Sequence, residues 1–155
     1  YYAYYLLSKL NGTIISKEDG YIITKNGNEY SILLYNYNPM IDNILKSNYS
    51  SNKISLSKAS VKKVSLNLRN INMDSKITIY EINEKIGSSY NYWLSMGSPD
   101  RLSKEEREIL SKASFPKVEF RYSKKSPILN IITKLNGYGA TLILITPIVK
   151  KAEKN

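Results

Sequence analysis

Residues 90–116 constrain the fold more than any other segment, because two helix boundaries lie within it, between regions that have the pattern of short strands. The first predicted helix carries one apolar face at the spacing i, i+3, i+4, i+7, formed by Tyr90, Trp93, Leu94 and Gly97. Gly97 favours a left-handed cap and Pro99 cannot continue a helix. We therefore expect a short helix that stops at this Met-Gly-Ser-Pro sequence.

A second helix is predicted to begin directly after this break. Ser103 can cap its N-terminus, and Glu106 three residues later completes a capping box. Ile109 and Leu110 give the helix an apolar side, and Pro116 prevents it from extending further. The segment is therefore expected to form two consecutive short helices.

Short strands are predicted on both sides of these helices. Their ranges are 13–16, 21–25, 29–37, 61–68, 77–82, 117–122, 127–133 and 140–149. The dipeptide Asn26-Gly27 is a strong hairpin signal between two of them. Segments 127–133 and 140–149 are rich in Ile and Leu, which predicts the buried interior of a sheet. This pattern predicts a mainly antiparallel β-sandwich, with a leading helix and a two-helix insertion at residues 90–114.

The length of 155 residues favours one domain with a single core. Residues 1–10 have a helical pattern with no polar lead-in, so we expect the domain to be excised from a longer chain and these residues to end a preceding helix. Residues 38–57 show no sustained period and are expected to form a flexible loop. Residues 150–155 are expected to be a solvated tail.

Composition excludes many kinds of enzyme site. The chain has no His and no Cys, so it can form neither a Ser-His-Asp or Cys-His catalytic site nor an imidazole or thiolate metal site. It also has no glycine-rich phosphate loop, and we predict no cofactor. A glycosidase needs two carboxylates across the scissile bond. Helix capping better explains Glu105, Glu106 and Glu108. A solvated face better explains Glu81 and Glu84, so no catalytic residue is predicted.

The formal net charge of +10 could indicate nucleic-acid binding. The lysines are scattered in short pairs and arginine is rare, which favours a general compositional bias instead. Aromatic side chains could form a carbohydrate platform, with Tyr35, Tyr37, Tyr90, Tyr92 or Trp93 as candidates. The alternative is that Trp93 and Tyr90 pack into the sandwich core or against a missing domain, and we favour this packing role.

The segment 90–116 resembles the C-terminal β-sandwich domain of glycoside hydrolase family 39 (GH39), the β-xylosidase and α-L-iduronidase type. The residues that match the family pattern, and that are expected to have packing roles, are Tyr90, Trp93, Met96, Gly97, Pro99, Leu102, Ser103, Glu106, Leu110 and Pro116. The resemblance implies that a barrel domain precedes this one and carries the catalytic glutamates. It therefore implies a non-catalytic accessory domain that packs on a barrel.

Three positions just before Tyr90 depart from the pattern. Many family members have Asp, His and Asn where this chain has Asn83, Ile86 and Ser88. This loss indicates that the parent protein is not a working xylosidase. The same module also occurs at the C-terminus of AraC-type regulators in Gram-positive bacteria. That context implies a cytoplasmic transcription regulator, DNA contact only through a separate helix-turn-helix domain, a possible sugar effector and no membrane.

Two alternatives stay open. The chain could be the accessory domain of an active β-xylosidase, or a freestanding module that binds carbohydrate or nucleic acid. The segment preceding Tyr1 in the parent would separate the regulator from the xylosidase.

Overall fold

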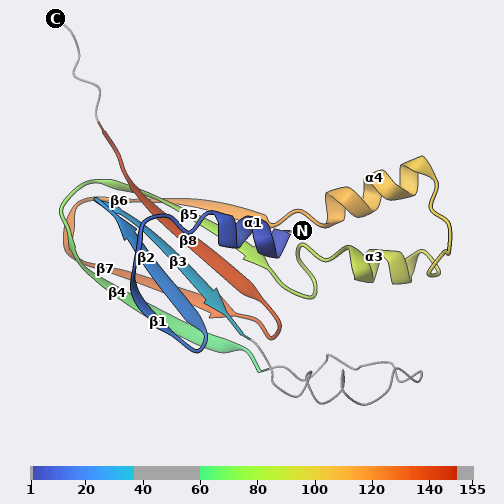
Figure 1. Ribbon diagram of the computed structural model, residues 1–155, viewed down its shortest axis with the longest axis horizontal. Helices are drawn as coiled ribbons and strands as arrows, with labels where there is room; N and C mark the ends of the chain where they lie inside the picture. The colour runs from blue at the N-terminus through green and yellow to red at the C-terminus, as the bar shows by residue number, and fades with distance from the viewer. Residues whose placement is uncertain (1, 37–59, 150–155) are drawn as a thin grey trace, which may run out of the picture.

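The structure, a computed structural model, describes residues 2–36 and 60–149 (Figure 1). The loop expected at 38–57 and the tail expected at 150–155 lie outside these residues. In chain order the elements are α1 (Tyr2–Ser8), β1 (Thr13–Glu18), β2 (Tyr21–Asn26), β3 (Glu29–Tyr35), β4 (Lys62–Ile71), β5 (Ser75–Ile82), α3 (Ser89–Ser95), α4 (Lys104–Ala113), β6 (Lys117–Ser123), β7 (Ser126–Leu135) and β8 (Ala140–Pro147).

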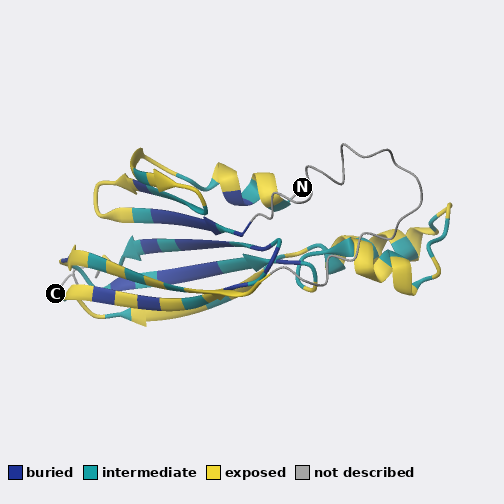
Figure 2. Ribbon diagram, turned by 90° about the horizontal axis from the view of Figure 1, so that it is seen from below, coloured by how far each residue is buried: buried dark blue, intermediate teal, exposed yellow. Residues whose placement is uncertain are grey.

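The strands form two antiparallel sheets. One has six strands in the order β1-β2-β3-β8-β5-β6, and the other contains only β4 and β7. The two sheets lie face to face, with buried residues turned toward the space between them (Figure 2). The predicted antiparallel β-sandwich, its leading helix and its two-helix insertion are therefore confirmed.

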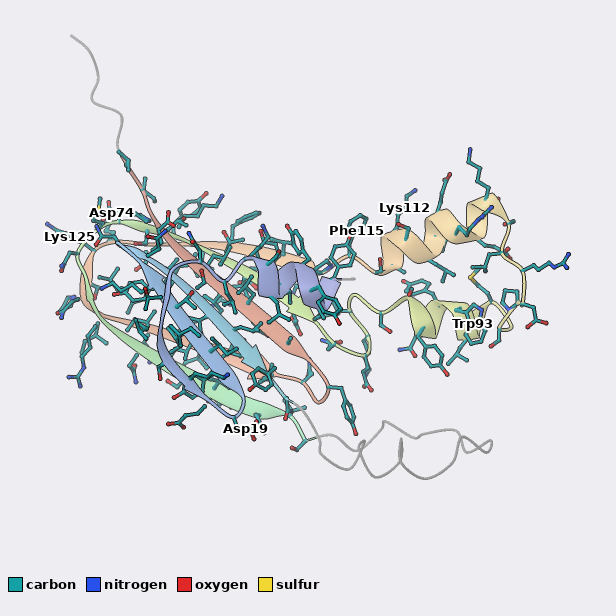
Figure 3. The ribbon with its side chains drawn as sticks, in the orientation of Figure 1. Asp19, Asp74, Trp93, Lys112, Phe115 and Lys125 are labelled. Carbon is teal, nitrogen blue, oxygen red and sulfur yellow. The ribbon has the colours of Figure 1, made fainter. Side chains whose placement is uncertain are left out.

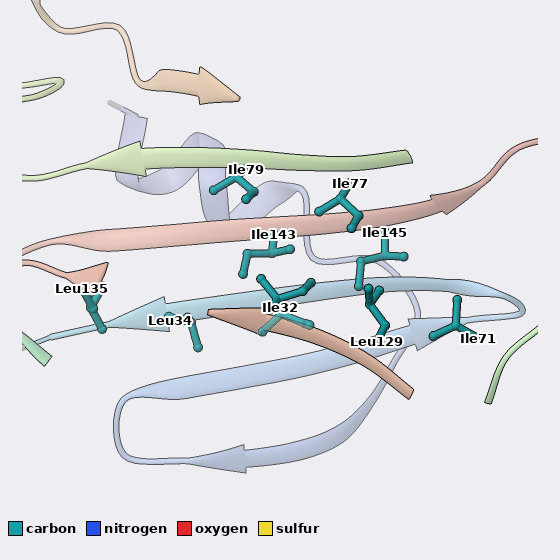
Figure 4. Close-up of a cluster of buried hydrophobic side chains, with 10 residues drawn as sticks. Ile32, Leu34, Ile71, Ile77, Ile79, Leu129, Leu135, Ile143 and Ile145 are labelled. Atoms are coloured by element: carbon teal, nitrogen blue, oxygen red, sulfur yellow. The ribbon is translucent and has the colours of Figure 1, made fainter. Parts of the chain in front are cut away.

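The main core lies between the sheets (Figure 4). In the six-stranded sheet, Ile32, Ile143 and Ile79 are consecutive cross-strand partners from β3, β8 and β5. Leu129 and Ile131 of β7 pack against this cluster from the opposite sheet. Burying an isoleucine side chain contributes about 1.5–3 kcal/mol, so each buried isoleucine of this layer is a substantial source of stability.

Helix α1 covers part of the other face of the six-stranded sheet. Leu6 is 1% exposed and packs with Leu33 and Leu142. The Tyr5 ring lies edge-on to Tyr80 of β5 at a centroid distance of 6.2 Å, and edge-on to Tyr2 at 5.8 Å. Gly12 then turns the chain into β1 with φ +89°, and a Cβ there would lie 2.2 Å from the carbonyl oxygen of Lys25. Only glycine fits this position.

Two local predictions differ from the structure. Asn26 pairs with Glu29, so the β2–β3 turn consists of Gly27 and Asn28, one residue later than the predicted Asn26-Gly27. Gly27 has φ +57°, which explains why the glycine opens the turn. The hairpin itself is confirmed, but the residues at its tip are not those predicted.

The prediction that both Ile-rich segments at 127–133 and 140–149 lie in the buried interior of a sheet is correct for one of them. β8 lies between β3 and β5 in the middle of the six-stranded sheet. β7 instead belongs to the two-stranded sheet, and Ile128 and Ile132 on its outer side are exposed. β7 therefore buries one face only, because no layer of described residues covers the other.

Candidate functional site

The helical hairpin, defined as α3, α4 and the loop between them, projects from one end of the sandwich between β5 and β6 (Figure 1). Neither helix contains a buried residue. All ten residues that match the family pattern lie in this hairpin or directly beside it, and none belongs to either core cluster. The structure thus brings them together, but away from the sandwich core.

Trp93 of α3 contacts the loop that follows the helix. Its ring stacks on Tyr90 at a centroid distance of 5.8 Å and an interplanar angle of 29°. Its Nε1–H donates a hydrogen bond to the carbonyl oxygen of Pro99 at 3.1 Å (Figure 3). Trp93 is therefore a packing residue of the hairpin itself. The structure does not place it in the sandwich core, which was one of the two packing positions considered above.

The helix stop after α3 has the predicted chemistry at a slightly different place. α3 ends at Ser95, and Gly97 takes the left-handed conformation with φ +86°. The amide of Ser98 donates to the carbonyl of Trp93 at 3.0 Å, which closes the last turn. Gly97 therefore caps the helix and does not belong to its apolar face.

The capping box at the start of α4 is present. The Glu106 amide donates to Ser103 Oγ at 3.2 Å, and Glu106 Oε2 accepts from the Ser103 amide at 2.7 Å. The hydrogen bond with the Ser103 backbone lowers the pKa of the Glu106 carboxyl below its ordinary value, and the hydrogen bond with the Ser103 side chain lowers it further. Ser103 and Glu106 therefore fix where α4 begins.

A polar cluster at the base of the hairpin sets its direction. Asn83 Oδ1 accepts from the amides of Lys85 and Ile86 at 2.8 and 2.9 Å. Asn83 Nδ2 donates to Glu81 Oε1 at 2.8 Å, and Asn136 Nδ2 donates to the same oxygen at 3.2 Å. The expectation that Glu81 lies on a solvated face is wrong, since it is half-buried and orders two amides.

Sequence reasoning missed this cluster because Asn136 lies 55 residues from Glu81 in the chain, so their contact depends on the fold. The only local signal is the Asn83 side chain, which is suited to bonding the backbone two or three residues ahead. The cluster contains one carboxylate and two amides. Glycoside hydrolysis requires two carboxyl groups, so this cluster contains only one of the two. Within residues 2–36 and 60–149, no group of three or more His, Cys, Asp or Glu side chains could hold a metal ion.

Exposed apolar side chains gather on the hairpin. This hairpin surface consists of Tyr90, Tyr92, Leu94, Ile109 and Phe115. Phe115 also contacts the ring of Tyr2 at 5.3 Å, so the surface continues onto the first turn of α1 (Figure 3). The hairpin and the start of α1 therefore lie at the same end of the sandwich. None of the helices in the described part of the chain is long and apolar enough to cross a membrane.

Three solved structures have a similar fold. The GH39 enzyme from Xanthomonas axonopodis pv. citri superposes with a TM-score of 0.75 at 13% identity, covering 95% of this chain and 30% of that one. A monomeric β-xylosidase from Caulobacter crescentus CB15 gives 0.71 at 17% identity, covering 96% and 30%. A GH39 β-xylosidase from Caulobacter crescentus gives 0.66 at 15% identity, covering 94% and 27%.

These similarities show that the chain has the β-sandwich fold found within GH39 proteins, and that it spans less than a third of their length. No protein-family model and no curated protein matches the sequence. The GH39-like β domain expected from residues 90–116 is therefore supported at the level of fold.

Proposed function

We propose that this chain is the non-catalytic accessory β-sandwich domain of a GH39-like protein, and that its hairpin surface packs against the barrel domain of the same protein. The observation that carries the proposal is the hairpin itself. α3 and α4 are 7 and 10 residues long and bury none of them. Isolated helices shorter than about 12–15 residues are marginal in water, so these helices need a surface to pack against.

The chemistry of the described residues supports a non-catalytic role. The carboxylates of α4 serve its N-terminus, where negative charge is favoured by the helix dipole. The Glu81 carboxylate is committed to Asn83 and Asn136. In this proposal, the acid and nucleophile of any hydrolytic reaction would belong to the barrel, and no cofactor is required.

The parent protein that we favour is a cytoplasmic AraC-type regulator of a Gram-positive bacterium, in which a helix-turn-helix domain recognises DNA and the barrel region takes a sugar effector. Support comes from the base of the hairpin. Asn83 stands where many GH39 proteins have Asp, and its side chain is occupied in forming a turn. Ile86 replaces a His with an apolar, half-buried side chain. Both residues serve structure and leave no polar group for a nearby substrate.

The second candidate is the accessory domain of an active β-xylosidase. The observation that favours it is that two of the structural neighbours are themselves described as β-xylosidases. An aryl β-xyloside assay on the full-length parent separates the two, with the 155-residue chain as a control. We expect no turnover from either protein. Turnover by the parent alone would establish the xylosidase, and turnover by the isolated chain would overturn the non-catalytic assignment.

The packing of the hairpin has its own test. Amide hydrogen exchange should be slower in α3 and α4 within the parent than in the isolated chain, because the barrel would cover them. β8 provides the internal control, since it is central in the sheet and should exchange equally slowly in both. Equal exchange of the hairpin in the two proteins would exclude it as the packing surface.

A further inference from the structure

The two-stranded sheet carries a strongly biased charge. β4 and β7 together contain four cationic side chains and no carboxylate: Lys62, Lys63, Arg69 and Lys134. One side of this sheet supplies Val64, Leu66, Leu68, Leu129 and Ile131 to the core, and the alternate residues face away from it. The outward residues form a surface that takes no part in the hairpin site.

This outer face consists of four cross-strand pairs, all exposed: Lys63 with Lys134, Ser65 with Ile132, Asn67 with Asn130, and Arg69 with Ile128. Lys63 and Lys134 are direct partners, and like charges in that position destabilise a sheet. Sheet stability therefore does not explain the pair. The fold places Lys63 and Lys134, which are far apart in the sequence, side by side on this face, so the argument from scattering does not apply to it.

The centre of the outer face is polar and ordered. Asn130 Nδ2 donates to Asn67 Oδ1 at 2.6 Å and to Ser65 Oγ at 3.3 Å. These bonds hold two amides and a hydroxyl in fixed positions between the cationic ends. The outer face thus presents hydrogen-bonding groups in the middle and positive charge on either side.

We propose that this outer face binds double-stranded DNA, with the β4–β7 ribbon in the major groove. That groove is about 12 Å wide and admits a two-stranded β-ribbon. Lys63 and Arg69 lie on one strand, about 20 Å apart at about 3.3 Å per residue, so they reach phosphates at separate points. The Asn130–Asn67 hydrogen bond leaves Asn67 Nδ2 to donate to base edges and Asn130 Oδ1 to accept from them, and exposed apolar side chains such as Ile128 can contact thymine methyl groups.

Duplex DNA fits this face better than a single strand does. Single-strand binding relies on aromatic side chains that stack on bases, and the eight outward residues of these two strands include none. The Lys63–Lys134 end is the more cationic of the two. At the Arg69 end, Asp74 accepts a hydrogen bond from the Lys125 amide at 3.0 Å (Figure 3). The DNA contact proposed for the outer face is additional to the DNA recognition that the proposed function assigns to a separate domain.

The test is fluorescence anisotropy of the 155-residue chain with a labelled duplex of about 20 base pairs, over a series of salt concentrations. The variant Lys63→Glu/Lys134→Glu removes the paired charge. Lys85→Glu/Lys104→Glu is the matched control, because it makes the same change in net charge at two exposed positions elsewhere. We expect roughly a tenfold or greater rise in Kd for the first variant, and a salt slope smaller by about 2.

The control variant should change Kd by much less. Equal weakening by the two variants would mean that only total charge matters, and would overturn the proposal. So would equal affinity for single-stranded DNA or for polyglutamate, since neither has a major groove. If the charge reversal unfolds the chain, Lys63→Gln/Lys134→Gln replaces it, with Lys85→Gln/Lys104→Gln as control and the same criteria.

Discussion

The sandwich and the helical hairpin differ in how far they bury their side chains. The sandwich buries Ile32, Leu142 and Ile143 completely, and every buried side-chain polar atom in residues 2–36 and 60–149 has a hydrogen-bond partner. The two helices of the hairpin contain no buried residue, yet all ten residues that match the family pattern lie in the hairpin or directly beside it. Specific sequence and stabilising core are thus separated in this chain. The difference fits the proposal that the hairpin packs against a barrel domain, whereas the sandwich supplies the core of this chain.

The largest effect that would test this contrast is Ile143→Ala. Ile143 is fully buried in the central strand and contacts partners on both sides, so truncation leaves a cavity that the sheet cannot close. We expect a loss of about 4 kcal/mol in the free energy of unfolding, measured by urea denaturation.

The matched change in the hairpin is Ile109→Ala, at an exposed position of α4. We expect it to alter the free energy of unfolding by less than about 0.5 kcal/mol. Comparable losses from the two substitutions would show that the hairpin contributes to the global stability of the isolated chain.

At the junction between α1 and β1, the expected effect is smaller than that of Ile143→Ala. Gly12→Ala requires an unfavourable left-handed conformation and also places a Cβ against the Lys25 carbonyl. We expect a cost of about 2–3 kcal/mol, seen as a lower urea midpoint. Gly27→Ala is the control, because it has a positive φ but nothing within 4 Å of the added Cβ. Equal costs would mean that conformation alone, and not the close approach, makes glycine necessary at position 12.

An effect smaller than that of Gly12→Ala is expected at the start of α4. Ser103→Ala removes the side-chain cap and should cost about 1 kcal/mol of local helix stability, measured by amide exchange of α4 and without a shift in the sandwich transition. A shift in the whole transition would show that the hairpin and the sandwich unfold together.

The same capping box gives a pH dependence. The pKa of Glu106 is lowered in the folded helix, so the contribution of its charged form is complete above the ordinary value of 4.5 and is lost as pH falls through the lowered value. The protection factors of the α4 amides, which compare each exchange rate with its intrinsic rate at the same pH, should therefore fall below that range in the wild type. Glu106→Gln should abolish this pH dependence.

Short sequence patterns predicted many of the helix boundaries and strands, because several of these patterns are complete within a few residues. Ser103 and Glu106 lie three residues apart and contain the whole capping box, so the start of α4 needed no tertiary information. The alternating pattern likewise identified the strands. What it could not supply is which strands share a sheet, since β7 and β8 have similar composition and only one is central.

The features that could not be predicted depend on contacts between distant segments. Asn136 reaches Glu81, and through it the neighbouring Asn83, only when the ends of β5 and β7 lie together. Lys63 and Lys134 become partners only through the register of β4 with β7. In both cases each residue has an ordinary local role in the sequence, and the site exists only in the assembled sheet pair.

The position of β8 has a consequence for biosynthesis. β8 joins β3 to β5, with Tyr30 opposite Ile145 and Ile77 opposite the same residue on the other side, and it is the last of the described strands to leave the ribosome. Before it emerges, the β1–β2–β3 meander and the β5–β6 pair have no strand between them, and each has an open apolar edge strand, β3 or β5. Such edges can pair with other chains. The nascent domain therefore exposes two unpaired strand edges until β8 joins the sheet.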